Sequence, residues 1–473
     1  MNILLISALL LGGCKANDPI ATPMPTADYS IVDGDTIKTV IFKDYKKLKD
    51  KDPNGKNYIT VGDTIVLYKE PKLHTPPAKD PDLSKLKNND DPDLKGKPLR
   101  YVAIGGSLTA GVRDGSYFNE GILTSYPNLI ARQMKLKKFE QPLFDATDYN
   151  GFGRKVRTSF NPTGGPVPKF NEVKNNSGVE SVDEKGVKLK KYNGNTLNID
   201  NLGLPYFKLR DLDINAEGNS KIFDDRIGGV RKILNDNKLY WESNKKTNIK
   251  FDFFSIELLD DVLNSTLNGW VGGEFSTTRP TLVHPVEDLL KRFSSAKLKG
   301  VIFNIPNIAD FPYFNLLTKQ QLINGYTGNS LPVTEPLSSD IMVFPSSKMD
   351  SAISEKVNIA LKPNLSKVIF ISKSELSKSV DYHNLFISKW AKENNFPVVD
   401  LNSLFKRIFS DSYITDDGIK IDKSYVNGNF FSKDALYPTP LGQAIIANEV
   451  IKTLNSHYKL EIPLISTKEY LNR

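Results

Sequence analysis

Ser107 is the side chain best placed to act as a nucleophile. It follows the apolar run at residues 101–104 and two glycines, Gly105 and Gly106, in the string Gly-Gly-Ser-Leu-Thr-Ala-Gly. A serine between a buried strand and a glycine-rich turn is exposed at the edge of a sheet, where a hydrolase presents its nucleophile. Because Gly-Ser turns are common, this string alone does not distinguish a nucleophile from an ordinary loop residue.

A second segment that could carry chemistry lies near the other end of the chain. Residues 432–444 read Ser-Lys-Asp-Ala-Leu-Tyr-Pro-Thr-Pro-Leu-Gly-Gln-Ala and lead into a stripe of helical period. Together with the Ser107 segment they resemble the SGNH/GDSL hydrolases, whose first block reads G-D-S-L. The last block of that family reads D-x-x-H, followed by a Pro or Thr step and a helix.

Segments between these two ends extend the resemblance. Residues 201–205 and 253–263 look like the second and third blocks of the family, and residues 304–308 and 431–450 are similar to a branch of large SGNH lipoproteins. The resemblance covers about residues 98–460. It implies an α/β fold, a three-layer α/β/α sandwich of flavodoxin-like type around a parallel sheet.

The resemblance also implies a serine esterase mechanism, of which this chain keeps only a part. The mechanism needs a serine, a histidine that takes its proton, an aspartate that orients the histidine, and Gly and Asn donors for the oxyanion. Ser107 and Asp434 match the serine and the aspartate, but the histidine position holds Tyr437. A phenol with an ordinary pKa of about 10 keeps its proton at neutral pH and cannot act as the base.

The oxyanion donors that the family supplies are altered too. Where the family has G-x-N-D, the chain has Leu-Leu-Asp-Asp at 258–261, so Asp260 replaces the Asn donor or the donor is lost. The second-block glycine is replaced by Tyr206, unless a shifted alignment uses Gly203, and Gly106 stands where the family has Asp. Loss of one donor costs about 10² to 10³ in rate and loss of the triad base about 10⁴. We therefore predict a pseudoenzyme.

Other side chains that could serve an active site give weaker patterns. None of the four histidines lies in a block that would supply a substitute base: His74, His284, His383 and His457. Asp260, Asp261 and Asp434 could form a carboxylate cluster for a divalent cation, but no fixed ligand spacing supports one. We predict neither a metal nor a cofactor.

The single cysteine, Cys14, lies directly behind the apolar run at residues 3–11 and two glycines. This pattern resembles the bacterial lipoprotein signal, which predicts a signal peptide at residues 1–13 and acylation of Cys14. Lys15 follows the cysteine in place of the aspartate associated with inner-membrane retention, which favours the outer membrane. An apolar run of about nine residues is too short to span a bilayer, so the lipid alone is expected to anchor the protein.

Between the cysteine and the large domain we predict three short units. Residues 14–30, rich in Pro, Thr and Ala, are expected to form a lipid-anchored tether. The string Gly-Asp-Thr-Ile occurs at 34–37 and again at 62–65, which predicts a small β-rich unit at 31–70 with turns at the Gly-Asp steps. Residues 71–97 are mostly Pro, Lys, Asp and Asn, which predicts a linker that cannot pack a core.

Beyond residue 98, short β-rich runs alternate with segments of helical period, as in a parallel sheet covered by helices. The predicted strands are residues 100–104, 250–256, 300–305, 367–372 and 397–401. The predicted helical stripes contain Val286, Leu289, Leu290 and Phe293, then Leu376, Val380 and Phe386, and last Leu441, Ile445, Ile446, Val450 and Leu454. Residues 140–248 look like elaborated loops, and 461–473 a C-terminal tail.

Composition excludes little, but it makes nucleic acid an improbable partner. The 473 residues are 39% hydrophobic and carry a net charge of +8, a mild excess without a recognised nucleic-acid motif. We therefore predict an envelope protein attached by lipid to the bacterial outer membrane, acting as a binding or accessory subunit of an outer-membrane β-barrel or another envelope protein. The alternative is an acyl-ester hydrolase that acts on lipid or acylated glycan through Ser107.

Overall fold

The computed structural model describes the following residues: 29–32, 35–41, 58–61, 64–67, 71–144, 148–159, 169–173, 179–183, 186–189, 199–209, 250–267, 285–316, 340–343, 370–425 and 427–471. Cys14, the predicted signal peptide and residues 14–28 of the predicted tether lie outside them, whereas residues 29 and 30 belong to a strand. Among the described residues, no helix has the length and apolar content needed to cross a membrane.

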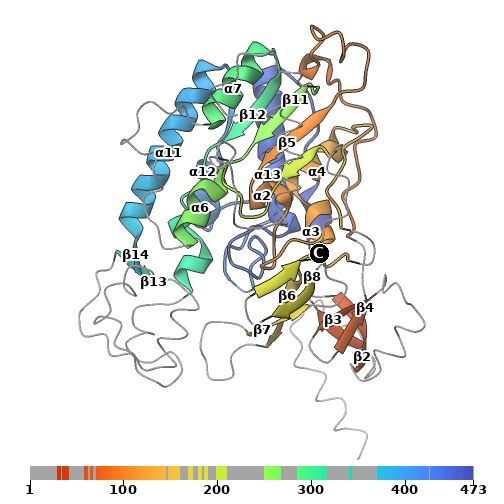
Figure 1. Ribbon diagram of the computed structural model, residues 1–473, viewed down its shortest axis with the longest axis vertical. Coiled ribbons are helices and arrows are strands. Elements are labelled where there is room, and N and C mark those ends of the chain that lie inside the picture. Colours follow the sequence, from red (N-terminus) through yellow and green to blue (C-terminus); the bar gives the residue numbers. More distant parts are fainter. Residues whose placement is uncertain are drawn as a thin grey trace, which may run out of the picture.

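A five-stranded parallel sheet forms the centre of the fold (Figure 1), in the spatial order β10, β5, β11, β12, β15. Its strands are β5 (Tyr101–Gly105), β10 (Asn201–Gly203), β11 (Phe253–Ile256), β12 (Lys299–Phe303) and β15 (Val398–Val399). The chain passes from β5 to β10 on one side and then to β11 on the other. This reversal creates a switch point between the carboxyl ends of β5 and β11, where proteins of this class bind ligands.

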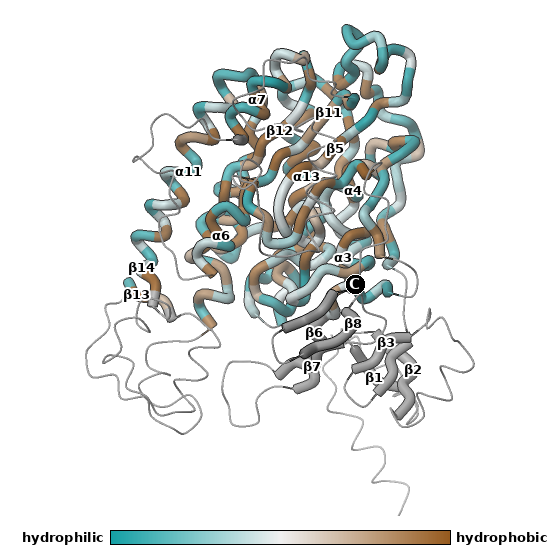
Figure 2. The backbone as a smooth tube through the Cα atoms, in the orientation of Figure 1, coloured by the Kyte–Doolittle hydropathy of each residue, from teal (hydrophilic) through white to brown (hydrophobic). Residues whose placement is uncertain are grey.

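Helices cover both faces of the sheet, so the predicted α/β class is confirmed (Figure 1). Helix α4 (Tyr126–Gln133) packs on α13 (Pro440–Tyr458), and α7 (Pro285–Ser295) packs on α11 (Lys373–Glu393). Figure 2 shows hydrophobic residues gathered along β5, β11, β12 and α13. The stripes predicted for α7 and α13 are buried throughout, and in α11 only Phe386 is half-exposed.

Two strand predictions need correction. Of residues 367–372, the structure describes Phe370–Ser372, which form a strand, β14, that pairs antiparallel with β13 (Ile341–Val343) outside the main sheet. Conversely, β10 was not predicted as a strand, because Asn and Gly have low strand propensity. Tertiary contacts hold it in place: the Asn201 side chain donates to the Thr109 carbonyl at 3.2 Å.

The prediction that residues 71–97 are a linker unable to pack is wrong. Leu86 is fully buried in the core of the domain, and the Asn88 amide donates to the buried Asp252 carboxylate at 2.9 Å. The predicted C-terminal tail, 461–473, is likewise docked over its described residues 461–471, since Tyr470 is buried and hydrogen-bonded to His74. Composition failed here because a few apolar side chains and backbone hydrogen bonds suffice to dock a polar segment on an existing core.

Pairs of short antiparallel strands occur in two other regions of the chain. Strands β1 (Tyr29–Val32), β2 (Asp35–Ile41), β3 (Tyr58–Val61) and β4 (Thr64–Leu67) form a sheet in the order β1, β2, β4, β3. Within residues 140–248, β6 (Arg154–Ser159) pairs with β7 (Lys169–Val173), and β8 (Val179–Asp183) pairs with β9 (Gly186–Leu189). The region read as loops therefore contains two hairpins.

Candidate functional site

Three distant segments meet at the switch point between β5 and β11. Ser107 begins the short helix α2 (Ser107–Ala110) after β5, and Asp260 lies in the first turn of α6 (Leu259–Leu267) after β11. Tyr437 comes from the loop before α13. The Ser107 amide donates to Asp260 Oδ2 at 2.7 Å, and the Tyr437 hydroxyl donates to Asp260 Oδ1 at 3.0 Å. The geometry thus joins the predicted first, third and last blocks around one carboxylate.

The loop after β10 completes this group. The backbone N–H of Tyr206 donates to Ser107 Oγ at 2.7 Å, and Tyr206 adopts a left-handed backbone with a φ of 59°. Gly203, the other residue considered for the second-block donor, lies inside β10 instead. A Cβ atom at that position would lie 2.4 Å from the Ala110 nitrogen, so Gly203 permits a close approach of two backbones. Tyr206 is therefore the second-block residue that contacts the serine.

Burial dominates the electrostatics of the group. Ser107 is 0% exposed, and Asp260 and Tyr437 are each 1% exposed. Burial raises the pKa of Asp260 to about 6, although hydrogen bonds from Ser107 and Tyr437 oppose the rise. Burial and the nearby Asp260 charge raise the pKa of Tyr437 well above its ordinary value. The phenol therefore stays protonated, as a donor to Asp260 and not as a base for Ser107.

A second buried carboxylate, Glu257, was missed by the sequence analysis. Its Oε2 accepts hydrogen bonds from Thr109 Oγ1 at 3.1 Å and from the Gly106 amide at 3.3 Å. Burial, followed by the charge of Asp260, raises the pKa of Glu257 to about 8. Its position directly after β11, at the functional edge of the sheet, was a signal that could have identified it.

Gly106 and Asp260 fit together sterically. A Cβ atom at position 106 would lie 2.5 Å from Asp260 Oδ2 and 2.8 Å from Asp260 Cβ. Asp260 therefore fills the space that a side chain at 106 would need. Where the family resemblance implies Asp in the first block and Asn in the third, this chain has a single carboxylate, supplied by the third block.

Asp434, the aspartate of the last block, links the loop before α13 to the turn that follows α2. It accepts hydrogen bonds from the amides of Leu436 at 2.9 Å, Tyr437 at 2.8 Å and Gly115 at 3.0 Å. Asp114 and Gly115 both have positive φ, of 52° and 69°, so this bond fixes a tight turn that follows α2. Burial raises the pKa of Asp434. Its geometry accounts for an aspartate at this position without any catalytic role.

The other described side chains that were considered for catalysis or metal binding lie apart from one another in the structure. Asp261 accepts from the Leu209 amide at 3.0 Å, which ties α6 to the loop after β10. His383 bonds the Ser379 carbonyl within α11, and His457 lies near the end of α13, while His284 is outside the described residues. Within the described ranges, no group of three or more His, Cys, Asp or Glu side chains could hold a metal ion.

Comparisons with known proteins add little to this geometry. No protein-family model matches the chain, and no curated protein matches it. Among solved structures, a candidate SGNH hydrolase from Slackia heliotrinireducens is similar at 10% sequence identity, over 76% of this chain and 100% of that chain. Its TM-score of 0.30 is too low to support an argument about function. The α/β class accordingly rests on the sheet and its helices.

Proposed function

We propose that this protein is a lipid-anchored envelope protein with an SGNH/GDSL-like domain whose esterase site is closed by its own side chains. The proposal depends on one observation above all. Both backbone donors that would stabilise an oxyanion are already occupied, the Ser107 amide by Asp260 and the Tyr206 amide by Ser107 Oγ. With these donors occupied, a tetrahedral intermediate at Ser107 has no preorganised stabilisation.

Two further features support inactivity. The Asp260 carboxylate would repel a developing negative charge at the same place. Ser107 is fully buried, and among the described residues no histidine is hydrogen-bonded to it, while Tyr437 keeps its own proton. The domain would then act as a binding or accessory subunit, with an outer-membrane β-barrel or another envelope protein as the partner. Attachment through acylated Cys14 would hold it at the outer membrane.

The test of inactivity compares the full chain with its Ser107→Ala variant. We expect both to react equally slowly with a fluorophosphonate and to hydrolyse short-chain nitrophenyl esters at the same rate. Stoichiometric labelling of Ser107 in the wild-type chain would overturn the proposal. For the anchor, Cys14→Ala should abolish the incorporation of labelled palmitate, and equal labelling of wild type and variant would exclude a lipidated Cys14.

One observation favours the alternative, an acyl-ester hydrolase acting on lipid or acylated glycan. Asp260 lies against Ser107, and its pKa of about 6 would let it accept a proton near neutral pH. In that case Asp260→Asn would abolish ester hydrolysis, and the wild-type rate would rise with pH through about 6. If the site is closed as proposed, Asp260→Asn cannot lower an activity that is absent, and it restores the amide of the family pattern.

A further inference from the structure

A cavity of about 430 Å³ opens at the amino ends of the strands, at the edge of the sheet opposite Ser107. This volume lies within the range of about 300 to 1,000 Å³ that is typical of small-molecule sites. Its wall includes residues of the docked segment 71–97, the start of β12, and the ends of α7, α11 and α13. No part of the proposed esterase-like site contributes to it.

Carboxamides dominate the polar wall of the cavity. Asn88 and Asn394 are only 6% and 8% exposed, and each is fixed by a bond from its side-chain nitrogen. Asn88 donates to the Ala296 carbonyl at 3.0 Å, and Asn394 donates to the Trp390 carbonyl at 2.8 Å. A carboxamide offers both donors and an acceptor, which matches a ligand hydroxyl that also donates and accepts.

Aromatic rings form a second, rigid part of the wall. The Tyr458 hydroxyl donates to the Gly300 carbonyl at 2.8 Å and accepts from the Gly300 amide at 2.9 Å, so the ring cannot swing away. Phe396 also lines the cavity and packs edge-to-face on Phe254, with ring centroids 4.9 Å apart. Fixed rings beside fixed amides provide an apolar surface next to directional polar groups.

The positive and negative charges around the cavity offset each other, so they do not favour an anionic ligand. Lys87 pairs with Asp252 at 3.0 Å and Lys297 pairs with Asp90 at 2.8 Å. Within the part of the chain that the structure describes, Lys299 forms no ion pair with a carboxylate. The carboxyl ends of α7, α11 and α13 all lie at this cavity. Their dipoles place partial negative charge at the cavity, which offsets the remaining ammonium group.

From these observations we infer that the cavity binds a neutral saccharide. A sugar ring offers hydroxyls to the carboxamides and to Lys299, and C–H groups to the partly exposed ring of Tyr458. An anionic ligand would meet the negative ends of three helices. The inference does not depend on the proposed function, since it concerns the other edge of the sheet.

The experiment uses saturation-transfer difference NMR on the full chain, with four neutral sugars: glucose, galactose, mannose and N-acetylglucosamine. Glucose 6-phosphate serves as the charged comparison. We expect at least one neutral sugar to bind, and the Asn89→Ala, Lys299→Met double variant to weaken it at least about tenfold, as expected for the loss of two polar contacts. Asn89 is an exposed carboxamide of the same wall, next to Asn88, and Lys299 is only partly buried, so the variant should fold.

The matched control is Lys138→Met, which removes an exposed lysine from a separate groove. Its binding should equal that of the wild type, and near-UV circular dichroism should show the same folded spectrum for all three proteins. Three results would overturn the inference: no transfer to any of the neutral sugars, equal binding by the double variant, or tighter binding of glucose 6-phosphate than of every neutral sugar.

Discussion

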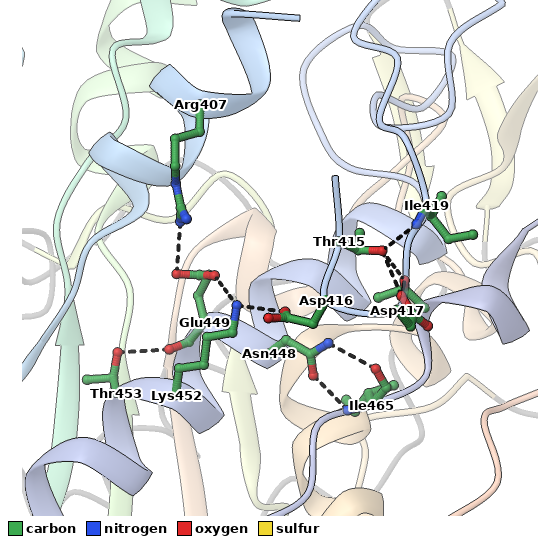
Figure 3. A network of polar contacts seen from close by, with 11 residues as sticks. Arg407, Thr415, Asp416, Asp417, Ile419, Asn448, Glu449, Lys452, Thr453 and Ile465 are labelled. Carbon is green, nitrogen blue, oxygen red and sulfur yellow. Dashed lines mark hydrogen bonds and ion pairs between the residues drawn. The ribbon is translucent and has the colours of Figure 1, made fainter. Parts of the chain in front are cut away.

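Asp260 lies in the buried cluster at the carboxyl edge of the sheet, whereas Asp417 lies near the surface, beside the C-terminal segment (Figure 3). Both accept several hydrogen bonds. Asp417 accepts from Thr415 Oγ1 at 2.7 Å, from Thr467 Oγ1, and from the Lys468 amide at 3.0 Å. Burial acts to raise the pKa of Asp417, but these hydrogen bonds outweigh it and lower the pKa to about 2.

In Asp260 the balance is reversed, and burial raises the pKa to about 6 despite donors on both oxygens. Hydrogen-bond donors alone therefore do not set the charge of a carboxylate in this protein. The depth of burial decides between a group that strengthens the fold as an anion and one that strengthens it when protonated. Four variants test this comparison, from the largest expected effect to the smallest.

The largest effect is expected when a carboxylate is placed in the core, where no group donates a hydrogen bond to it. Val450, in α13, is fully buried in the hydrophobic core of the domain. Val450→Asp should prevent stable folding, because it buries an unpaired charge and removes apolar packing. Together these should cost about 4 kcal/mol or more, a large part of the 5 to 15 kcal/mol by which a typical domain is stable. Thermal melting and soluble yield measure it. Val450→Ala is the control, and a cooperative melt of the Asp variant near that of wild type would show that this helix is misplaced in the core.

Glu257→Gln tests the buried carboxylate with the higher pKa. The folded-state pKa of about 8 exceeds the ordinary 4.5, so the folded state holds a proton that the unfolded state releases. Stability is then fully present below pH 4.5 and falls as the pH rises towards 8. Glutamine mimics the protonated acid, so the variant should lose this slope and be more stable than wild type at pH 8 by a few kcal/mol. Urea unfolding at pH 5 and pH 8 gives the free energy of unfolding of both proteins. An equal change in this free energy between the two pH values for wild type and variant would contradict a protonated Glu257.

Asp417→Asn tests the opposite case at the surface. The folded-state pKa of about 2 lies below the ordinary 3.8, so Asp417 stabilises the fold above pH 3.8, and this stabilisation is lost as the pH falls through 2. Because the group is partly exposed, solvent screening limits the effect to about 1 kcal/mol at pH 7. Acid unfolding between pH 5 and pH 2 should show a shallower decline for the variant. An unchanged decline would mean that the bonds from Thr415 and Thr467 do not favour the anion.

Ser107→Ala should have the smallest effect on stability. An exposed turn serine would contribute almost nothing, but Ser107 Oγ accepts the Tyr206 amide at 2.7 Å in a buried setting. Removing the acceptor takes one hydrogen bond from the buried site, which should cost about 0.5 to 1 kcal/mol. The midpoint of urea unfolding measures the loss. A change below about 0.5 kcal/mol would indicate that solvent reaches the Tyr206 amide.

The sequence predicted the parts of the fold that depend on periodicity. The apolar positions of α7 and α13 follow the helical repeat, and strands β5, β11 and β12 are mostly apolar runs. The docking of residues 71–97 was not predictable in this way, because it depends on individual contacts such as the one between His74 and Tyr470, which lie 396 positions apart.

The candidate site was only partly predictable for a similar reason. Residue types at family positions identified Ser107, Asp434 and the Tyr437 substitution. The pattern did not reveal where the Tyr437 hydroxyl points, since its acceptor Asp260 is 177 positions away in the chain. It also gave Asp434 a catalytic position, whereas the structure shows an acceptor for three backbone amides.

The close fit of Gly106 against Asp260 restricts the order in which this site could change during evolution. A change to an Asp-Ser pattern by Gly106→Asp alone would drive a side chain into the space that Asp260 occupies, with its Cβ 2.5 Å from the Asp260 Oδ2. A smaller or displaced residue at 260 must therefore come first, before any gain at 106 can be selected. The two positions form an epistatic pair, and a lineage that has accepted this pair leaves it only through a specific sequence of substitutions.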